Sequence, residues 1–223
     1  MISWLSIIMA DKQGQIDYFE GLLAKHGENY LALDWNGPES QKLRYEILKE
    51  IFVYGKRASN ISVLDVGCGL GDLFGFFKSE RLLAQHKIRY TGLDIAPKML
   101  EAARRKYPEA GFELKDILEE KDVPKADYIF CSGIFNIRTI DYKSHLVHVR
   151  SMLQRMFELA NCGVAVNFLS EGALPLSDPE GLNSGRYFYF KPEEILGYCR
   201  SIGGRFMLRH DYHPGDFTVY LLK

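Results

Sequence analysis

The sequence predicts an α/β fold: a doubly wound, seven-stranded sheet whose last strand runs antiparallel, preceded by an N-terminal helical lid. From Ile61 onward, short apolar segments alternate with segments of helical spacing, as in a parallel sheet with helices on both faces. The alternation ends at 204–222, where strand, turn and strand follow one another, so the final strand should run against its neighbour. A length of 223 residues suits one such domain with a helical extension.

The apolar patterns place each element in turn. Ahead of the sheet, two helices are expected from apolar residues at helical spacing, namely Ile16, Phe19, Leu22 and Leu23, then Leu43, Ile47, Ile51 and Tyr54. Strands are expected at about 61–66, 88–94, 111–115, 126–132, 162–168, 204–210 and 216–222. Helices are expected at about 71–84, 97–107, 141–160 and 192–201. We therefore divide the chain into a helical extension or lid at 1–58 and a ligand-binding domain at 59–223.

Composition favours a globular protein without a nucleic-acid or membrane partner. Hydrophobic residues make up 47% of the chain and charged residues 26%, and the formal net charge of -1 does not indicate the basic face that binds nucleic acid. The apolar start, "MISWLSIIMA", lacks a basic region before it and is too short to span a membrane. The four cysteines form no C-x-x-C pair, so we expect reduced thiols in a cytoplasmic protein.

A glycine-rich segment, "VLDVGCGLGDL", follows the first expected strand. Ligands of open α/β sheets bind beyond the carboxyl ends of the strands, and glycine lets a ligand approach the backbone closely. A dinucleotide loop needs G-x-G-x-x-G, whereas Gly67, Gly69 and Gly71 are spaced G-x-G-x-G, and Asp72 stands at the third dinucleotide glycine. With Asp65 on the strand just before, two acids favour a ligand with a positive group over one with phosphates.

Three further strand ends carry residues suited to a nucleoside. Asp94 ends the second strand, where an acid can accept hydrogen bonds from ribose hydroxyls. Asp116 follows the third strand and could meet an adenine amino group, with Ile117 against the ring. The fourth strand leads into Ser132 and Gly133, whose small side chains leave room above the sheet.

Four segments in this order, "VLDVGCGLGDL", "TGLDIAPKML", "FELKDIL" and "ADYIFCSGIFN", resemble the successive motifs of class I S-adenosylmethionine-dependent methyltransferases. The resemblance covers about 61–223 and implies a Rossmann-like sheet and S-adenosyl-L-methionine as cofactor. It also implies which residues contact each part of the cofactor. Asp65, Gly67 and Gly69 would contact the amino-acid end, and Asp94 would hold the ribose hydroxyls, with Ile95 and Met99 near the adenosine. Asp116 and Ile117 would flank the adenine, and Ser132 would lie near the methyl group. The resemblance implies no particular catalytic residue.

Each of these residues also has a purely structural interpretation. The glycines could serve only the turn, and Asp94 could cap the helix that begins near Pro97. Asp116 could be a helix cap or a surface acid, and Ser132 could simply be small at a crowded strand end. Cys68 is interpreted as a loop filler, because no basic residue nearby would lower the pKa of its thiol.

The sequence says less about the binding site of the methyl acceptor, because one fold can serve many acceptors. Three segments could build it: the N-terminal lid with Tyr30, Trp35 and Asn36, the loop "SGIFNIRTIDYKSH", and the insertion "LSEGALPLSDPEGLNSGRYFYF" with Arg186, Tyr187 and Tyr189. His210 and His213, beside the last turn, are unsupported candidate bases. His145 and His148 lie three positions apart, but without a third ligand pattern they are interpreted as solvated surface residues.

The resulting hypothesis is a methyltransferase that acts on a small-molecule acceptor. It is expected to need no metal, because no Asp-Asn or Asp-Asp pair follows the fourth strand. A methyltransferase for RNA or protein, and a non-catalytic domain that binds the cofactor, remain alternatives. A nicotinamide-dependent oxidoreductase is disfavoured by Asp72 and by the glycine spacing.

Overall fold

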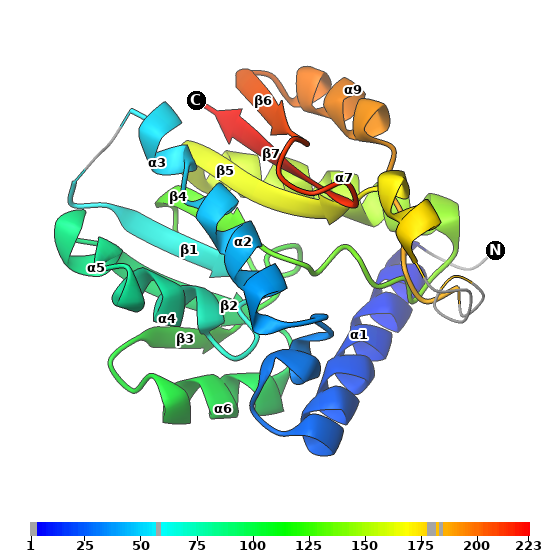
Figure 1. Cartoon of the computed structure of the whole chain (residues 1–223), viewed down its shortest axis with the longest axis horizontal. Coiled ribbons are helices and arrows are strands. Elements are labelled where there is room, and N and C mark those ends of the chain that lie inside the picture. The colour runs from blue at the N-terminus through cyan, green and yellow to red at the C-terminus, as the bar shows by residue number, and fades with distance from the viewer. Residues whose placement is uncertain (1–3, 57–58, 178–181, 183–184) are drawn as a thin grey trace.

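The computed structural model describes residues 4–56, 59–177, 182 and 185–223, with side chains from residue 12 onward. Its sheet has seven strands in the order β3-β2-β1-β4-β5-β7-β6 (Figure 1). The strands are β1 Ser62–Val66, β2 Arg89–Asp94, β3 Gly111–Leu114, β4 Ala126–Cys131, β5 Ala160–Leu169, β6 Arg205–Arg209 and β7 Asp216–Leu222. Neighbours from β3 to β5 pair in parallel, whereas β7 is antiparallel to both β5 and β6. The predicted fold class is confirmed.

Helices cover both faces of the sheet. Helices α2, α3, α4 and α6 pack on one face, and α7 and α9 pack on the other. The bounds are α1 Trp4–His26, η1 Tyr30–Leu33, α2 Pro38–Leu48, α3 Ile51–Tyr54, α4 Asp72–Ser79, α5 Leu82–Gln85, α6 Pro97–Lys106, α7 Tyr142–Leu159, η2 Glu171–Leu176 and α9 Pro192–Ile202. The described part of the chain contains no helix that is long and apolar enough to span a lipid bilayer, and all four cysteines are free thiols.

Two predicted helices are each interrupted. The expected helix at 71–84 becomes α4 and α5, because Arg81 adopts a left-handed conformation with φ of 60°. The expected helix that ends at Tyr54 becomes α2 and α3, because the Glu50 N–H bonds to Ile47 O three residues back and tightens the turn.

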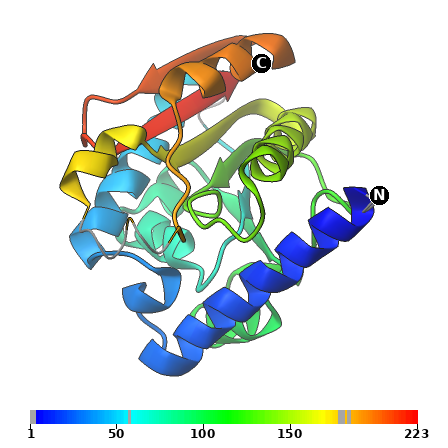
Figure 2. The same cartoon turned by 90° about the vertical axis from the view of Figure 1, so that its right-hand side faces the viewer.

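Helix α1 and the short helix η1 lie across the carboxyl ends of the strands (Figure 2). Ile16 and Leu23 of α1, with Leu33 of η1, pack against a small apolar cluster beside the sheet. The cluster consists of Ala32, Leu70, Ala96, Met99 and Ala102. The N-terminal segment therefore covers the edge of the sheet where the glycine loop lies.

Candidate functional site

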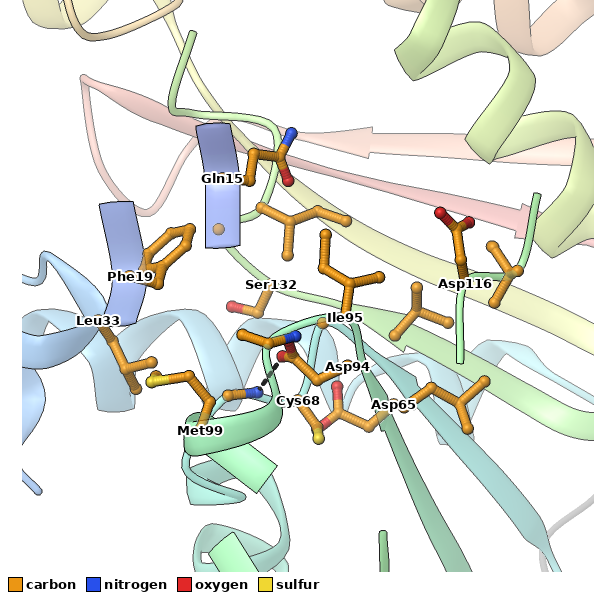
Figure 3. Close-up of a pocket in the computed structure, with 18 of the residues that line it drawn as sticks. Gln15, Phe19, Leu33, Asp65, Cys68, Asp94, Ile95, Met99, Asp116 and Ser132 are labelled. Atoms are coloured by element: carbon orange, nitrogen blue, oxygen red, sulfur yellow. Dashed lines mark hydrogen bonds between the residues drawn. The ribbon is translucent and has the colours of Figure 1, made fainter. Parts of the chain in front are cut away.

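One pocket opens between α1 and the carboxyl ends of β1, β2, β3 and β4 (Figure 3). The empty space within it, its open mouth included, is about 1130 Å³. Every residue that the sequence assigned to a ligand lines this pocket: Asp65, Gly67, Gly69, Asp94, Ile95, Met99, Asp116, Ile117 and Ser132. The sheet topology brings these residues together from four separate strand ends.

The glycine loop is shaped by backbone conformation and by the lid. Gly67 and Gly69 have φ of 74° and 52°, in the left-handed region that glycine favours. A Cβ atom at Gly69 would lie 2.6 Å from Cδ2 of Leu33, so the absence of a side chain also lets η1 pack on the loop. The left-handed backbone of the turn therefore favours glycine at position 69, whereas the terminal methyl group of Leu33 could shift to make room for a Cβ atom.

Asp94 organises the loop from the end of β2. Its Oδ2 accepts a hydrogen bond from the Gly69 N–H at 2.8 Å, and its Oδ1 accepts one from the Ala96 N–H at 2.9 Å. Burial raises the pKa of this carboxyl above its ordinary value, and the backbone hydrogen bonds oppose that shift. Asp94 thus holds the backbone just before α6 but does not cap the first turn of that helix, whose N-cap residue is Ala96. Each carboxylate oxygen keeps a second lone pair that a ribose hydroxyl could use.

Asp65 is a buried carboxyl group in the floor of the pocket. Its side chain accepts a 2.5 Å hydrogen bond from the Tyr90 hydroxyl. Burial raises the pKa of Asp65 to about 7, and the nearby charges of Asp94 and Asp72 act in the same direction. A cation that entered the pocket beside Asp65 would favour the ionised form and lower this pKa.

Asp116 lines the pocket after β3 and forms an ion pair with α1. Its Oδ1 accepts a hydrogen bond from the Leu118 N–H at 2.9 Å, two residues further on. Its Oδ2 lies 3.3 Å from Nζ of Lys12 on α1, and the same ammonium contacts Glu119 at 2.6 Å. Gln15 and Phe19 of α1 face the same space from above (Figure 3).

Ser132 marks the other end of the pocket. Its hydroxyl is buried and has no hydrogen-bond partner among the described residues. Trp35 also lines this end, and a Cβ atom at Gly133 would lie 3.3 Å from its Cζ2. Trp35 is therefore the one residue of the three named lid candidates that reaches this pocket, whereas Tyr30 and Asn36 do not line it.

The charge argument from Asp72 needs correction. Asp72 does not line the pocket: its carboxylate pairs with Lys106 at 2.5 Å and accepts a hydrogen bond from Gln41 at 3.1 Å. Its charge is compensated by a lysine 34 positions away, which the local sequence could not reveal. Of the two acids, only Asp65 faces the ligand space.

The interpretation of the paired histidines as solvated was wrong. His145 is fully buried, its Nε2–H donates to Phe135 O at 2.9 Å, and its ring stacks on Phe188. Burial lowers the pKa of His145 to about 4. His148 is half-buried and lines the pocket. Among the described residues, no group of three His, Cys, Asp or Glu side chains could hold a metal ion.

Residues from the extension were missed as site residues. Lys12, Gln15, Ile16, Phe19 and Leu33 line the pocket, but only the apolar spacing of Ile16 and Phe19 was visible in the sequence. That spacing predicts a packed helix face without saying where it packs. Among the insertion candidates, Arg186 lies 3.9 Å from Asp34, whose carboxylate also accepts a 2.8 Å hydrogen bond from Tyr18.

Comparison with known proteins agrees with this geometry. Residues 64–164 match the family model of a methyltransferase domain. The chain is 28% identical over 168 residues to the methyltransferase candidate Rv1506c of Mycobacterium tuberculosis, covering 74% of this chain and 95% of that protein. It is also 28% identical over 127 residues to a trans-aconitate 2-methyltransferase of Methylobacterium nodulans, which is 55% of this chain and 44% of that protein.

Among solved structures, the fold resembles that of magnesium protoporphyrin IX methyltransferase from Synechocystis PCC 6803, solved with bound S-adenosylhomocysteine. The TM-score is 0.65 at 17% identity, and the match covers 96% of this chain and 99% of that one. The sheet order, the ordered motifs and the family model define a methyltransferase. The chain is similar to the class I S-adenosylmethionine-dependent methyltransferases over residues 64–164 and in its fold, and these comparisons support S-adenosyl-L-methionine as its cofactor.

Proposed function

We propose that this enzyme binds S-adenosylmethionine in the pocket beneath α1 and transfers the methyl group to a small-molecule acceptor without a metal ion. The observation that carries the proposal is the convergence of all nine sequence-predicted residues on one pocket. When bound, the cofactor supplies a methyl group already activated on a sulfonium. The protein then has to align an acceptor and exclude water.

Each pocket residue has a proposed role that its surroundings support. Asp65 pairs with the cofactor ammonium, because it is the buried carboxylate beside the glycine loop. Asp94 binds the ribose hydroxyls with lone pairs that its backbone contacts leave open. Asp116 and Ile117 flank the adenine, with Ile95 and Met99 against the adenosine. Ser132 lies beside the methyl group, where its buried hydroxyl has no partner among the described residues.

The division into two parts remains a proposal of the same kind. We propose that residues 1–58 form a helical lid and that 59–223 form the domain that binds the cofactor. The packing of Leu33 against Gly69 and the contact between Lys12 and Asp116 support it. A lid that closes on the cofactor would exclude water from the reacting centre.

A small acceptor is favoured by the enclosure of the pocket. Side chains of α1 cover the cofactor space, and Trp35 walls the end near Ser132. The name of the trans-aconitate 2-methyltransferase relative denotes a small acid, which supports the same class of acceptor.

The experiment that tests the proposal measures S-adenosylhomocysteine released from S-adenosylmethionine. Trans-aconitate, a small-molecule filtrate of cell extract and the retained RNA and protein fraction serve as separate acceptor sources. The filtrate should support turnover and the retained fraction should not. Turnover with the retained fraction alone would contradict a small acceptor. Tight cofactor binding without turnover on any source would indicate the non-catalytic alternative.

A further inference from the structure

A second set of polar residues lies beside the pocket, at the carboxyl end of β5. Asp216, the first residue of β7, pairs with Leu169, and Asn167 lies two residues earlier on β5. Side chains two apart on a strand share a face, as do directly opposed residues of an antiparallel pair, so Asn167 and Asp216 are diagonal neighbours. Arg44 of α2 reaches the same face, because its Nη2 pairs with Asp216 Oδ2.

The hydrogen bonds of the Arg44–Asp216 pair are unevenly distributed. Asp216 Oδ2 also lies 2.9 Å from Nδ1 of His213, whereas Oδ1 has no partner among the described residues. Arg44 Nη1 donates to the carbonyl and the hydroxyl of Ser40, both at 2.6 Å. Its Nε–H, however, has no partner within the described part of the chain. One free acceptor and one free donor therefore remain on a buried ion pair.

Asn167 adds a second free donor. Its Oδ1 accepts a hydrogen bond from the Gly133 N–H at 3.0 Å, and this contact fixes the orientation of the amide because only the oxygen can accept. Its Nδ2 has no partner in the described ranges. A single small polar group placed between diagonal neighbours could reach both side chains.

These three atoms are deeply buried, so their lack of partners is energetically significant. The exposed fractions of Asn167, Asp216 and Arg44 are 0%, 1% and 6%. A buried polar atom left without a hydrogen bond costs about 1–3 kcal/mol, and native proteins contain few of them. Three in one neighbourhood indicate a position for an external polar group.

Contacts through Trp35 connect this position to the pocket. The indole of Trp35 lines the pocket and lies 4.9 Å from the Arg44 guanidinium. A Cβ atom at Gly133 would lie 3.3 Å from Cζ2 of the same indole, and Gly133 follows Ser132 directly. Asn167, Arg44 and Asp216 do not line the pocket themselves, so Trp35 lies between the polar set and the end of the pocket at which we propose that the methyl group lies.

The chemistry of the free atoms selects a class of ligand. Arg44 and Asp216 compensate each other, so the set offers two N–H donors and one carboxylate acceptor with no net charge. A ligand carboxylate would face Asp216 Oδ1 with like charge, and an ammonium could accept nothing from Asn167 or Arg44. A hydroxyl or a carboxamide both accepts and donates, and it satisfies all three atoms.

We propose that Asn167, Arg44 and Asp216 form a subsite that binds an uncharged hydroxyl or carboxamide group of the methyl acceptor. This inference rests on the proposed function for the presence of an acceptor. It assigns the group by which the acceptor is recognised, and that group is distinct from the atom that receives the methyl.

Crystals grown with S-adenosylhomocysteine and soaked separately in acetamide, isopropanol or acetate test the subsite. Acetamide or isopropanol should bind with its polar atoms in hydrogen-bond contact with at least two of Asn167 Nδ2, Arg44 Nε and Asp216 Oδ1. Acetate should not bind there. Acetate at the subsite, or water alone in all three soaks, would overturn the proposal.

Variants separate the subsite from the cofactor site. Asn167→Leu should abolish the probe density and leave the affinity for S-adenosylhomocysteine within about twofold of wild type. If leucine prevents folding, Asn167→Ala removes the same donor without adding bulk. Thr218→Val is the matched control on β7, because the Thr218 hydroxyl bonds to Tyr212 at 2.9 Å. Missing S-adenosylhomocysteine density would count against the proposed function, whereas missing probe density beside bound S-adenosylhomocysteine would count only against the subsite.

Discussion

Lys12 on α1 and Asp116 after β3 face each other across the mouth of the pocket, with 3.3 Å between the ammonium and the carboxylate. Two further pairs join the N-terminal segment to α6: Glu20 of α1 with Lys98 at 2.7 Å, and Glu28, two residues beyond the end of α1, with Arg105 at 2.8 Å. Charged contacts at the surface therefore supplement the modest apolar packing of α1. Such contacts weaken with salt, so the hold of the helix on the pocket should depend on ionic strength.

Replacing Lys12 should loosen the lid. Lys12→Met keeps the aliphatic stem and removes the charge, and an exposed ion pair contributes about 0–1 kcal/mol. We expect S-adenosylhomocysteine to dissociate about two- to fivefold faster at low salt, with the difference shrinking as salt is added. Stopped-flow dissociation measures this rate. Lys78→Met is the control, since Lys78 pairs with Glu109 at 2.6 Å away from the pocket. Equal rates for Lys12→Met and wild type at low salt would refute the tether.

Cofactor binding should release a proton from Asp65. Burial raises the pKa of Asp65 to about 7, so much of this carboxyl is protonated in the free protein just below neutral pH. The cofactor ammonium favours the ionised form and lowers the pKa, so the proton leaves on binding. Affinity should therefore increase as the pH rises toward about 7 and change little above it.

Calorimetry in buffers of different ionisation enthalpy counts the released proton. Binding of S-adenosylhomocysteine near pH 6.5 should release protons, and Asp65→Asn should abolish the release. Methylthioadenosine lacks the amino-acid end and should release none from the wild-type protein. Equal proton release by the two ligands would exclude pairing between Asp65 and the ammonium.

Asp94→Asn should weaken cofactor binding more than it weakens the fold. Asparagine can still accept a hydrogen bond from one backbone N–H, but it has no carboxylate for the ribose hydroxyls. We expect a loss of about 1–3 kcal/mol in cofactor affinity, the cost of leaving hydrogen-bond partners unpaired. Isothermal titration with S-adenosylhomocysteine measures it. Asp122→Asn, at an exposed ion pair with Lys115, should bind as wild type does; unchanged affinity in Asp94→Asn would remove the ribose role.

His145 should make the protein sensitive to acid. Its folded-state pKa is lowered from 6.5 to about 4, because protonation would place a charge and a buried Nδ1–H without a partner among the described residues. The unfolded chain therefore binds more protons between pH 6.5 and 4. The stability contributed by the neutral ring is fully present above pH 6.5, and about 3 kcal/mol of it is lost as the pH falls to about 4.

The raised pKa of Asp65 makes the fold more stable as the pH falls over part of this range, which opposes the effect of His145. The effect of His145 is therefore measured as a difference between a variant at this position and wild type. His145→Phe keeps a ring against Phe188 and cannot be protonated. The difference in unfolding free energy between His145→Phe and wild type, from urea denaturation, should shift in favour of the variant below pH 6. His26→Gln is the control, and a pH-independent difference for His145→Phe would contradict the assignment.

The strands were predictable because apolar alternation and glycine or proline boundaries are local signals. The same holds for the strand ends, whose acids converge once a parallel sheet is assumed. His145 was misjudged although its signal was present: it lies four and eight residues before Val149 and Leu153, on the same buried stripe of α7. The sequence interpretation placed His145 at the surface because histidine is polar, and it disregarded the position of this residue on the apolar stripe.

Ion pairs between residues far apart in the sequence could not be predicted from local sequence patterns. Arg44 and Asp216 are 172 positions apart, and Lys106 reaches Asp72 across 34. The placement of α1 over the pocket likewise depends on tertiary packing, because its apolar spacing is compatible with many surfaces. The convergence of the strand-end residues on one pocket could therefore be predicted from the sequence, whereas the contacts of α1 and the neighbourhood of Arg44 and Asp216 could not.

Strand β7 lies between β5 and β6, and every residue from Asp216 to Leu222 is buried. During synthesis β6 leaves the ribosome before the strand that is its sole neighbour in this sheet. The hairpin of β6 and β7 must therefore assemble and dock on β5 late, after the cofactor-binding half has been made. A nascent chain arrested before Asp216 would expose the open edge of β5 and invite pairing with other chains.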